Sequence, residues 1–117
     1  MAAETELHFK SAAELARMIQ TREISSRELL EHFIARTALH NPKINAIVAS
    51  DFDAARKRAL EADEALARGE TWGPLHGLPM TVKDAYEVKG LPSTGGSPEY
   101  KDHVPERSAT PVERIEN

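Results

Sequence analysis

Apolar and polar residues alternate with helical spacing near the start of the chain. Ser11 and Glu14 have the spacing of a capping box, a pair of side chains that satisfies two backbone N–H groups at a helix N-terminus. The apolar side chains that follow share one face, as in an amphipathic helix: Ala12, Leu15, Met18 and Ile19. This pattern predicts a helix over residues 11–20.

A second amphipathic segment repeats the same device. Ser25 and Glu28 form another capping-box pair, and one stripe at helical spacing contains Leu29, Leu30, Phe33, Ile34 and Thr37. Pro42 has no backbone N–H to continue a helix, so we predict a helix over residues 25–40. The short apolar run at 44–49 is either a strand or an extended link.

The third periodic segment is dominated by alanine. Its face consists mostly of small side chains, which would let a neighbouring element approach closely: Ala55, Ala59, Ala62 and Leu66. Gly69 is a typical residue just past a helix C-terminus. The sequence therefore predicts a helix over residues 51–68.

The remaining residues, 69–117, are rich in glycine and proline. Five of the six glycines and six of the seven prolines lie between residues 73 and 111. The clearest strand candidate is 79–82, and residues from 84 onward are expected to form mainly loops and turns. Stretches of this kind are typical of functional loops or of parts of something larger. The length favours a single domain over 1–117, with three helices and one or two short strands.

Composition narrows the function classes. The chain carries 15 basic and 19 acidic residues, a net charge of −4, which argues against binding to nucleic-acid phosphates. It has no cysteine, which excludes a thiolate zinc site and a cysteine nucleophile. The five histidines lack metal-site spacing, and each is expected to be a surface or hydrogen-bonding residue: His8, His32, His40, His76 and His103. There is no apolar run long enough for a membrane span and no secretory signal pattern, so we expect a cytoplasmic protein.

One segment combines several features that can carry chemistry. Residues 73–84 read GPLHGLPMTVKD, so a glycine-proline turn leads into a short apolar stretch that ends at Lys83. Partial burial lowers the pKa of a lysine and can make it a general base near neutral pH, for instance in Ser-Lys catalysis. The alternative is that Lys83 pairs with Asp84, or with another acid, at an exposed turn.

The same segment resembles the lysine-bearing motif of the amidase signature family. That motif is commonly G-P-L-x-G-[VIL]-P-x-x-[VIL]-K-D, and residues 73–84 match it at every position. Residues 90–97 resemble the G-x-x-T-x-G-S stretch that follows it. Residues 23–26 and 41–46 resemble the family's entry helices and the link after them, and 108–114 resembles the start of its next helix. The resemblance extends over nearly the whole chain.

The resemblance implies a fold and a mechanism. The fold is α/β, with a mixed central sheet between helices, and this chain is its mainly helical N-terminal part. Family members hydrolyse or transfer amide groups with a serine nucleophile, a second serine whose peptide bond is cis, and a lysine. Lys83 matches that lysine, whose family role is to deprotonate the second serine. The implied substrate is a small-molecule amide, and the chemistry needs neither a cofactor nor a metal.

The resemblance also implies that this chain is incomplete as a catalyst. In the family both serines lie downstream of the lysine, beyond residue 117, and Ser93, Ser97 and Ser108 do not occupy their positions. We therefore expect a hydrolase chain that is truncated before both serines and inactive alone. Two alternatives stay open. One is a non-catalytic helical interaction module that forms a homodimer through exposed helix faces, and the other is one half of a split amidase.

Overall fold

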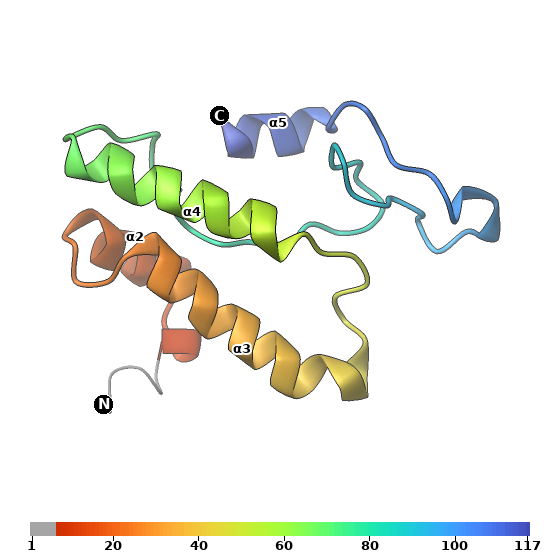
Figure 1. Ribbon diagram of the computed structural model, residues 1–117, viewed down its shortest axis with the longest axis horizontal. Coiled ribbons are helices and arrows are strands. Elements are labelled where there is room, and N and C mark those ends of the chain that lie inside the picture. The colour runs from red at the N-terminus through yellow and green to blue at the C-terminus, as the bar shows by residue number, and fades with distance from the viewer. Residues whose placement is uncertain (1–6) are drawn as a thin grey trace. The chain divides into compact units, whose positions relative to one another are not determined.

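The computed structural model describes residues 7–117 as helices joined by long loops (Figure 1). The described elements are two short 3-10 helices and four α-helices: η1 (Leu7–Phe9), α2 (Ala12–Gln20), α3 (Ser26–Ile44), α4 (Phe52–Ala67), η2 (Pro98–Tyr100) and α5 (Thr110–Glu116). These elements fall into two compact units. The first contains the described residues up to Asn45 together with Phe52–Pro79, and the second contains Ala46–Asp51 together with Met80–Asn117.

The first two α-helices begin at the expected capping boxes. At α2, Ser11 Oγ accepts a hydrogen bond from the Glu14 N–H at 3.2 Å, and the Glu14 carboxylate accepts one from the Ser11 N–H at 2.8 Å. Ser25 and Glu28 form the same reciprocal pair at α3, with distances of 3.0 and 2.9 Å. Each box satisfies backbone donors that a helix leaves without internal partners.

The N-terminus of α3 has a second cap that comes from α4. The Asp63 carboxylate accepts hydrogen bonds from the backbone N–H groups of Ser26 at 2.7 Å and Arg27 at 3.1 Å. A carboxylate in this position also interacts favourably with the positive end of the helix dipole. Asp63 thereby fastens the start of α3 to the middle of α4.

The C-terminal end of α3 differs from the prediction. The expected end at residue 40, before Pro42, is wrong, because the helix continues to Ile44 with Pro42 inside its last turn. Proline lacks an N–H wherever it lies, but here the helix ends at Ile44, shortly after Pro42, so little of the helix depends on the missing bond. Asn45 then ends the helix in a left-handed conformation, φ +47°, and its N–H donates to the Asn41 carbonyl at 2.7 Å.

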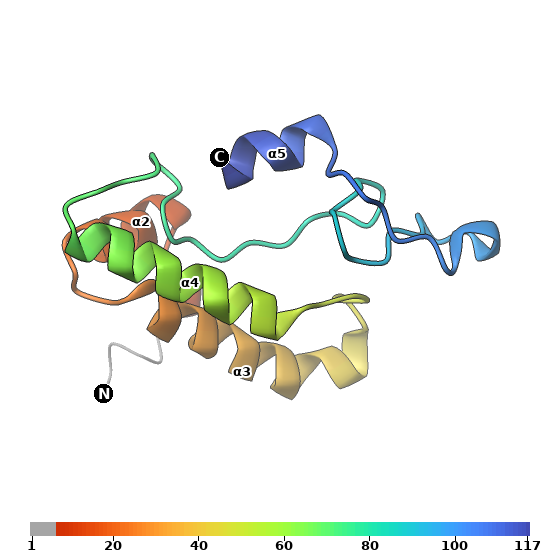
Figure 2. The same cartoon turned by 45° about the horizontal axis from the view of Figure 1, so that its top comes forward.

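The core of the first unit lies where η1, α2 and α3 meet. Its buried side chains are Leu7, Leu15, Ile19 and Leu29, with Met18, Ile24, Phe33, Leu66 and Leu78 packed against them. Helices α3 and α4 lie side by side (Figure 2). The buried face of α4 consists of Ala59, Ala62 and Ala65, which are 0–6% exposed. Ala59 and Ala62 lie on the face that the sequence predicts, Ala65 is not among the residues predicted for it, and the predicted Ala55 and Leu66 are only half-buried.

The predicted strands are absent from the described part of the chain. Residues 79–82 form no strand, and the 44–49 run begins at the last residue of α3 and continues without regular structure. A strand forms only when its backbone pairs with a neighbouring strand, and none is present among residues 7–117. Met80 and Val82 are left 49% and 38% exposed. The one or two short strands expected from the sequence are therefore wrong for this structure.

The second unit contains mostly loops, with η2 and the short helix α5. Pro111 lies in the first turn of α5, where its missing N–H removes no helical hydrogen bond. Val112 is the buried residue of this helix. Turns and side-chain-to-backbone hydrogen bonds hold the loops before α5, as described below.

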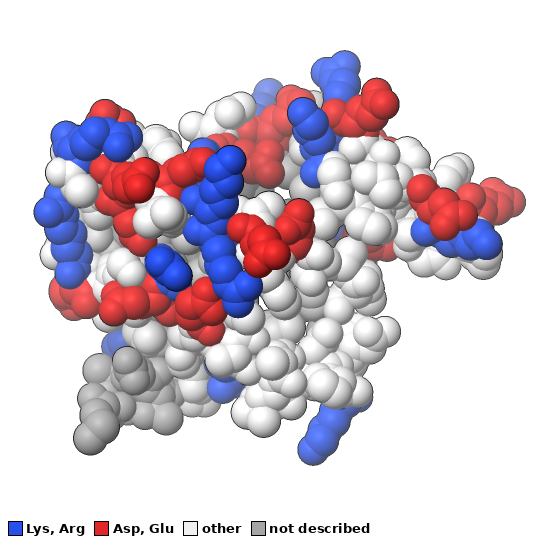
Figure 3. All heavy atoms as spheres, in the orientation of Figure 1, with Lys and Arg blue, Asp and Glu red and all other residues white. Residues whose placement is uncertain are grey.

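Charged side chains of both signs are interspersed over the surface shown in Figure 3. Several form exposed ion pairs, such as Arg17 with Glu23 at 2.6 Å and Arg56 with Glu31 at 2.6 Å. The surface over the C-terminal half of α3 carries little charge in this view. None of the helices among residues 7–117 has the length and hydropathy needed to cross a membrane.

Candidate active site

The first half of the 73–84 segment belongs to the first unit and has a structural role. Gly77 adopts φ +74°, and its carbonyl accepts a hydrogen bond from Ser26 Oγ at 2.6 Å. A Cβ at Gly77 would lie 3.1 Å from Ser26 Cβ and 3.3 Å from Ile19 Cγ2. Only glycine combines this left-handed conformation with so close an approach to a neighbouring helix.

His76 is buried, with 3% of its surface exposed. Its Nδ1 accepts a hydrogen bond from the Trp72 backbone N–H at 3.0 Å, and its Nε2 lies 2.8 Å from the Ala62 carbonyl. A neutral imidazole with its proton on Nε2 satisfies both contacts. His76 is therefore a hydrogen-bonding residue that ties the loop to α4, in agreement with the sequence-based expectation for the histidines.

The Trp72 ring packs beside His76, where the loop is bonded to α4. Its ring centroid lies 4.9 Å from that of His76, and the Arg58 guanidinium lies 3.9 Å from the centre of the Trp72 ring. The second distance is typical of a cation–π contact. The GPLHG portion of the motif thus secures the loop to α3 and α4 through backbone and ring contacts.

The second half of the motif lies in the second unit and carries Lys83. The Lys83 carbonyl accepts a hydrogen bond from the Tyr86 N–H at 2.9 Å, which closes a four-residue turn. The Lys83 side chain is exposed. Among residues 7–117, no acidic side chain lies within ion-pair distance of its amine.

Asp84 does not pair with Lys83 but bonds to a loop ten residues downstream. Its Oδ2 accepts a hydrogen bond from Thr94 Oγ1 at 2.8 Å, and its Oδ1 lies 3.4 Å from the Thr94 N–H. The Thr94 hydroxyl bond, together with the N–H groups of Thr94, Gly95 and Gly96, holds the pKa of the Asp84 carboxyl below its usual value. The side chain next to Lys83 is therefore an ionised carboxylate that is already engaged.

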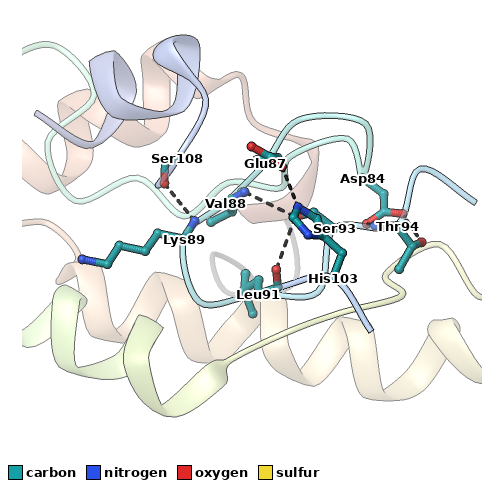
Figure 4. A network of polar contacts seen from close by, with 9 residues as sticks. All are labelled: Asp84, Glu87, Val88, Lys89, Leu91, Ser93, Thr94, His103 and Ser108. Carbon is teal, nitrogen blue, oxygen red and sulfur yellow. Dashed lines mark hydrogen bonds and ion pairs between the residues drawn. The ribbon is translucent and has the colours of Figure 1, made fainter. Parts of the chain in front are cut away.

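The serine hydroxyls near this turn bond to backbone groups. Ser93 is buried, and its Oγ donates to the Leu91 carbonyl at 3.3 Å and accepts from the Val88 N–H at 3.4 Å (Figure 4). Ser108 Oγ accepts a hydrogen bond from the Lys89 N–H at 2.9 Å. Both hydroxyls shape loops, and the geometry gives neither of them the role of a nucleophile.

A histidine–glutamate contact in the same network has no counterpart in the sequence analysis. His103 Nε2 donates to Glu87 Oε1 at 2.6 Å (Figure 4). The Glu87 carbonyl accepts the Ala109 N–H at 2.8 Å. The two side chains are 16 residues apart, and no local pattern links them. Within residues 7–117, the structure brings no three metal-binding side chains together.

Comparisons with known proteins give the family. The family model described as Amidase matches residues 28–117. The chain is 38% identical over 112 residues to an acylamidase of Rhodococcus erythropolis, a match that covers 96% of this chain and 24% of that protein. It is also 38% identical over 106 residues to a glutamyl-tRNA(Gln) amidotransferase subunit from Acidothermus cellulolyticus, and this match covers 91% of this chain and 21% of that protein.

A comparison with solved structures points to the same family. A bacterial aryl acylamidase of the amidase signature family resembles the chain with a TM-score of 0.76 at 35% identity, over 81% of this chain and 20% of that one. The chain spans about a quarter or less of the length of these three proteins. Because the family model covers most of the 117 residues, including the whole 73–84 segment, the chain belongs to the amidase signature family.

Proposed function

We propose that this chain supplies the catalytic lysine of a hydrolase that acts on carbon–nitrogen bonds of amides, and that Lys83 is this lysine. The observation that carries the proposal is the position of Lys83. It occupies the lysine position of the family motif, and the neighbouring carboxylate of Asp84 is engaged by Thr94. The Lys83 side chain is exposed.

The proposed reaction follows the Ser-Ser-Lys scheme. In this scheme the Lys83 amine takes a proton from a bridging serine, which in turn takes the proton of the nucleophilic serine. The nucleophile's Oγ forms a bond to the amide carbon, and backbone N–H groups stabilise the oxyanion. The C–N bond then breaks, the amine leaves with the proton held by the lysine, and water releases the acyl group.

We take the two serines to come from outside the described residues, because the family motif places them downstream of the lysine. Ser93 and Ser108 use their hydroxyls in loop hydrogen bonds, as shown above. We therefore expect the 117 residues alone to hydrolyse no amide, and the same residues joined to a serine-bearing portion to be active. A second polypeptide that supplied the serines would also satisfy this expectation.

The first experiment determines the mass of the protein that the source cells make, detected through the peptide 73–83. This protein is then assayed on small aliphatic amides, aryl amides and glutamine, with Lys83→Ala beside the wild type. Loss of a general base is expected to lower kcat by roughly 10²–10⁴-fold. Lys101→Ala removes an exposed lysine of the same unit and serves as the matched control. Unchanged turnover in Lys83→Ala would refute the proposal.

A second candidate function is self-association, and a specific observation favours it. Leu39 and Ile44 on α3 are 68% and 65% exposed, so these two apolar side chains have no cover within residues 7–117. A homodimer formed through this helix would bury them. Light scattering of the chain over a hundredfold range of concentration tests the idea, because a constant monomer mass contradicts it.

A further inference from the structure

We propose that Asp84 is a positioning residue, whose carboxylate fastens the Lys83 turn to the Thr94–Gly96 loop and thereby sets where the lysine amine stands. This inference rests on the proposed function, because it assigns Asp84 a role only in relation to Lys83. It concerns the second unit alone.

The first step of the argument is the turn itself. The hydrogen bond from the Tyr86 N–H to the Lys83 carbonyl makes Lys83 the first residue of the turn and Asp84 the second. A lysine side chain has several rotatable bonds, so the position of its amine depends on a fixed backbone and a defined first rotamer. Whatever holds the second residue of the turn therefore also fixes the peptide that leaves Lys83.

The second step is the anchorage after the turn. The Glu87 carbonyl accepts the Ala109 N–H at 2.8 Å, and the Lys89 N–H donates to Ser108 Oγ at 2.9 Å. The Val88 N–H is bonded to Ser93. Three consecutive residues are thus tied to other loops on the C-terminal side of the turn.

The third step is the bond at Asp84, which holds the turn near its start. Thr94 Oγ1 donates to Asp84 at 2.8 Å (Figure 4). The same hydroxyl oxygen accepts the Gly96 N–H at 3.2 Å. Gly95 and Gly96 adopt φ +57° and +74°, which turns the loop back towards the carboxylate. Since the Asp84 acceptor is charged and the donors around it are fixed, this is a charge-assisted anchor.

One anchor holds Asp84, the second residue of the Lys83 turn, and the other holds residues 87–89 just after the turn, and both leave the lysine side chain exposed. Without the bond at Asp84, the nearest anchor would lie beyond the end of the turn. The amine would then sample more positions, and a displacement of about 1 Å from a productive geometry can cost on the order of a hundredfold in rate. The Asp84 carboxylate itself, bonded to Thr94, takes no proton in this scheme.

The test measures kcat and KM of the protein that the source cells make, as the wild type and as variants with single substitutions on either side of the Asp84–Thr94 bond. Asp84→Ala and Thr94→Val are expected to lower kcat roughly tenfold to a hundredfold with KM within about twofold. Thr94→Ser keeps the hydroxyl donor and is expected to retain most of the activity. Asp102→Asn changes an exposed aspartate of the same unit and is the matched control. Because Thr and Val have nearly the same shape, their comparison separates the hydrogen bond from packing.

A second readout does not depend on turnover. In NMR spectra of the 117-residue chain, Asp84→Asn is expected to shift the amide resonances of Thr94 and Gly96, ten and twelve residues away in sequence, whereas Asp102→Asn leaves them in place. If Asp84→Asn moves none of these resonances, the carboxylate does not hold the turn and the inference is wrong.

The outcomes separate the two proposals. Full activity in Lys83→Ala refutes the proposed function, and the role of Asp84 falls with it. Inactivity in Lys83→Ala with wild-type kcat in Asp84→Ala and Thr94→Val refutes only the positioning role. Equal losses of kcat in Thr94→Ser and Thr94→Val would show that the hydroxyl hydrogen bond does not position the lysine. That result would also refute the positioning role of Asp84.

Discussion

Ser26 and Gly77 are joined by a 2.6 Å hydrogen bond from the serine Oγ to the glycine carbonyl, although they are 51 residues apart. Ser26 is 2% exposed and begins α3, and Gly77 lies in the middle of the family motif. The motif's glycine thus serves the packing of the loop on α3. Glycine is needed at position 77 because the loop packs closely on α3 there. The catalytic role proposed for the motif belongs to Lys83 instead.

Gly77→Ala is expected to destabilise the first unit. The new Cβ would lie 3.1 Å from Ser26 Cβ, and φ +74° is already unfavourable for alanine. Together these effects should cost about 2–3 kcal/mol of unfolding free energy. Urea unfolding followed by circular dichroism measures it. Gly69→Ala is the control, because Gly69 has a similar φ of +78° with open space around it, and about 1 kcal/mol is expected there. Equal losses would mean that the Ser26 contact carries no cost.

Asp63→Ala is expected to weaken the start of α3. It removes the acceptor of the Ser26 and Arg27 N–H groups while the capping box of Ser25 stays in place. Loss of a helix cap costs roughly 0.5–2 kcal/mol. Glu64→Ala, an exposed carboxylate next along α4, is the control in the same unfolding experiment. Hydrogen exchange should show faster exchange at Ser26 and Arg27, and unchanged exchange there would contradict the cap.

The helix starts of the first unit could be predicted because their signals lie in contiguous residues. The capping boxes at Ser11 and Ser25 and the apolar spacing after them are local, and α2, α3 and α4 begin within one residue of the expected positions. The end of α3 could not be placed as well. Pro42 is the predicted stop, but the helix runs past it, and the local signal for the true end is Asn45, since asparagine after glycine is the residue that most readily adopts the left-handed conformation at a helix end.

The contacts of the candidate site could not be predicted, because they join residues far apart in sequence. Thr94 reaches Asp84, and His103 reaches Glu87, only after the loops of the second unit have folded. The strand expected at 79–82 depends in the same way on a partner strand. The role of Lys83 was inferred from the family motif and stays a prediction, since a general base is defined by the group whose proton it takes.

His76→Leu is expected to lower the stability of the first unit by about 1–3 kcal/mol, because it leaves the part-buried Trp72 N–H without its acceptor. Trp72 is the only tryptophan of the chain and lies beside the His76 ring, so its fluorescence reports the change directly. His40→Leu, at an exposed position on α3, is the control. If the variant unfolds like the wild type and its emission spectrum is unchanged, His76 does not tie the loop to α4.

The stability of the first unit is expected to fall as the pH drops below about 6.5, through His8. Desolvation, and then the positive charges of Arg36, His32 and His40, lower the pKa of His8 from its ordinary value of 6.5. The unfolded chain therefore binds a proton more readily than the folded chain, and unfolding becomes more favourable as the pH falls. His8 Nδ1 also lies 3.2 Å from His32 Nε2, and this hydrogen bond needs one nitrogen without a proton.

Unfolding in urea between pH 7.5 and 5.0 tests this expectation, with His8→Gln beside the wild type. The variant should show a flatter dependence of stability on pH in this window. The carboxylates whose pKa is lowered, such as Glu28 by its bonds to Ser25 and Glu31 by its bond to Arg56, act at lower pH. The stability that these carboxylates contribute is present above a pH of about 4.5 and is lost only as the pH falls further. The window from 7.5 to 5.0 therefore isolates histidine titration. Parallel curves for wild type and His8→Gln would rule out His8 as the source of the pH dependence.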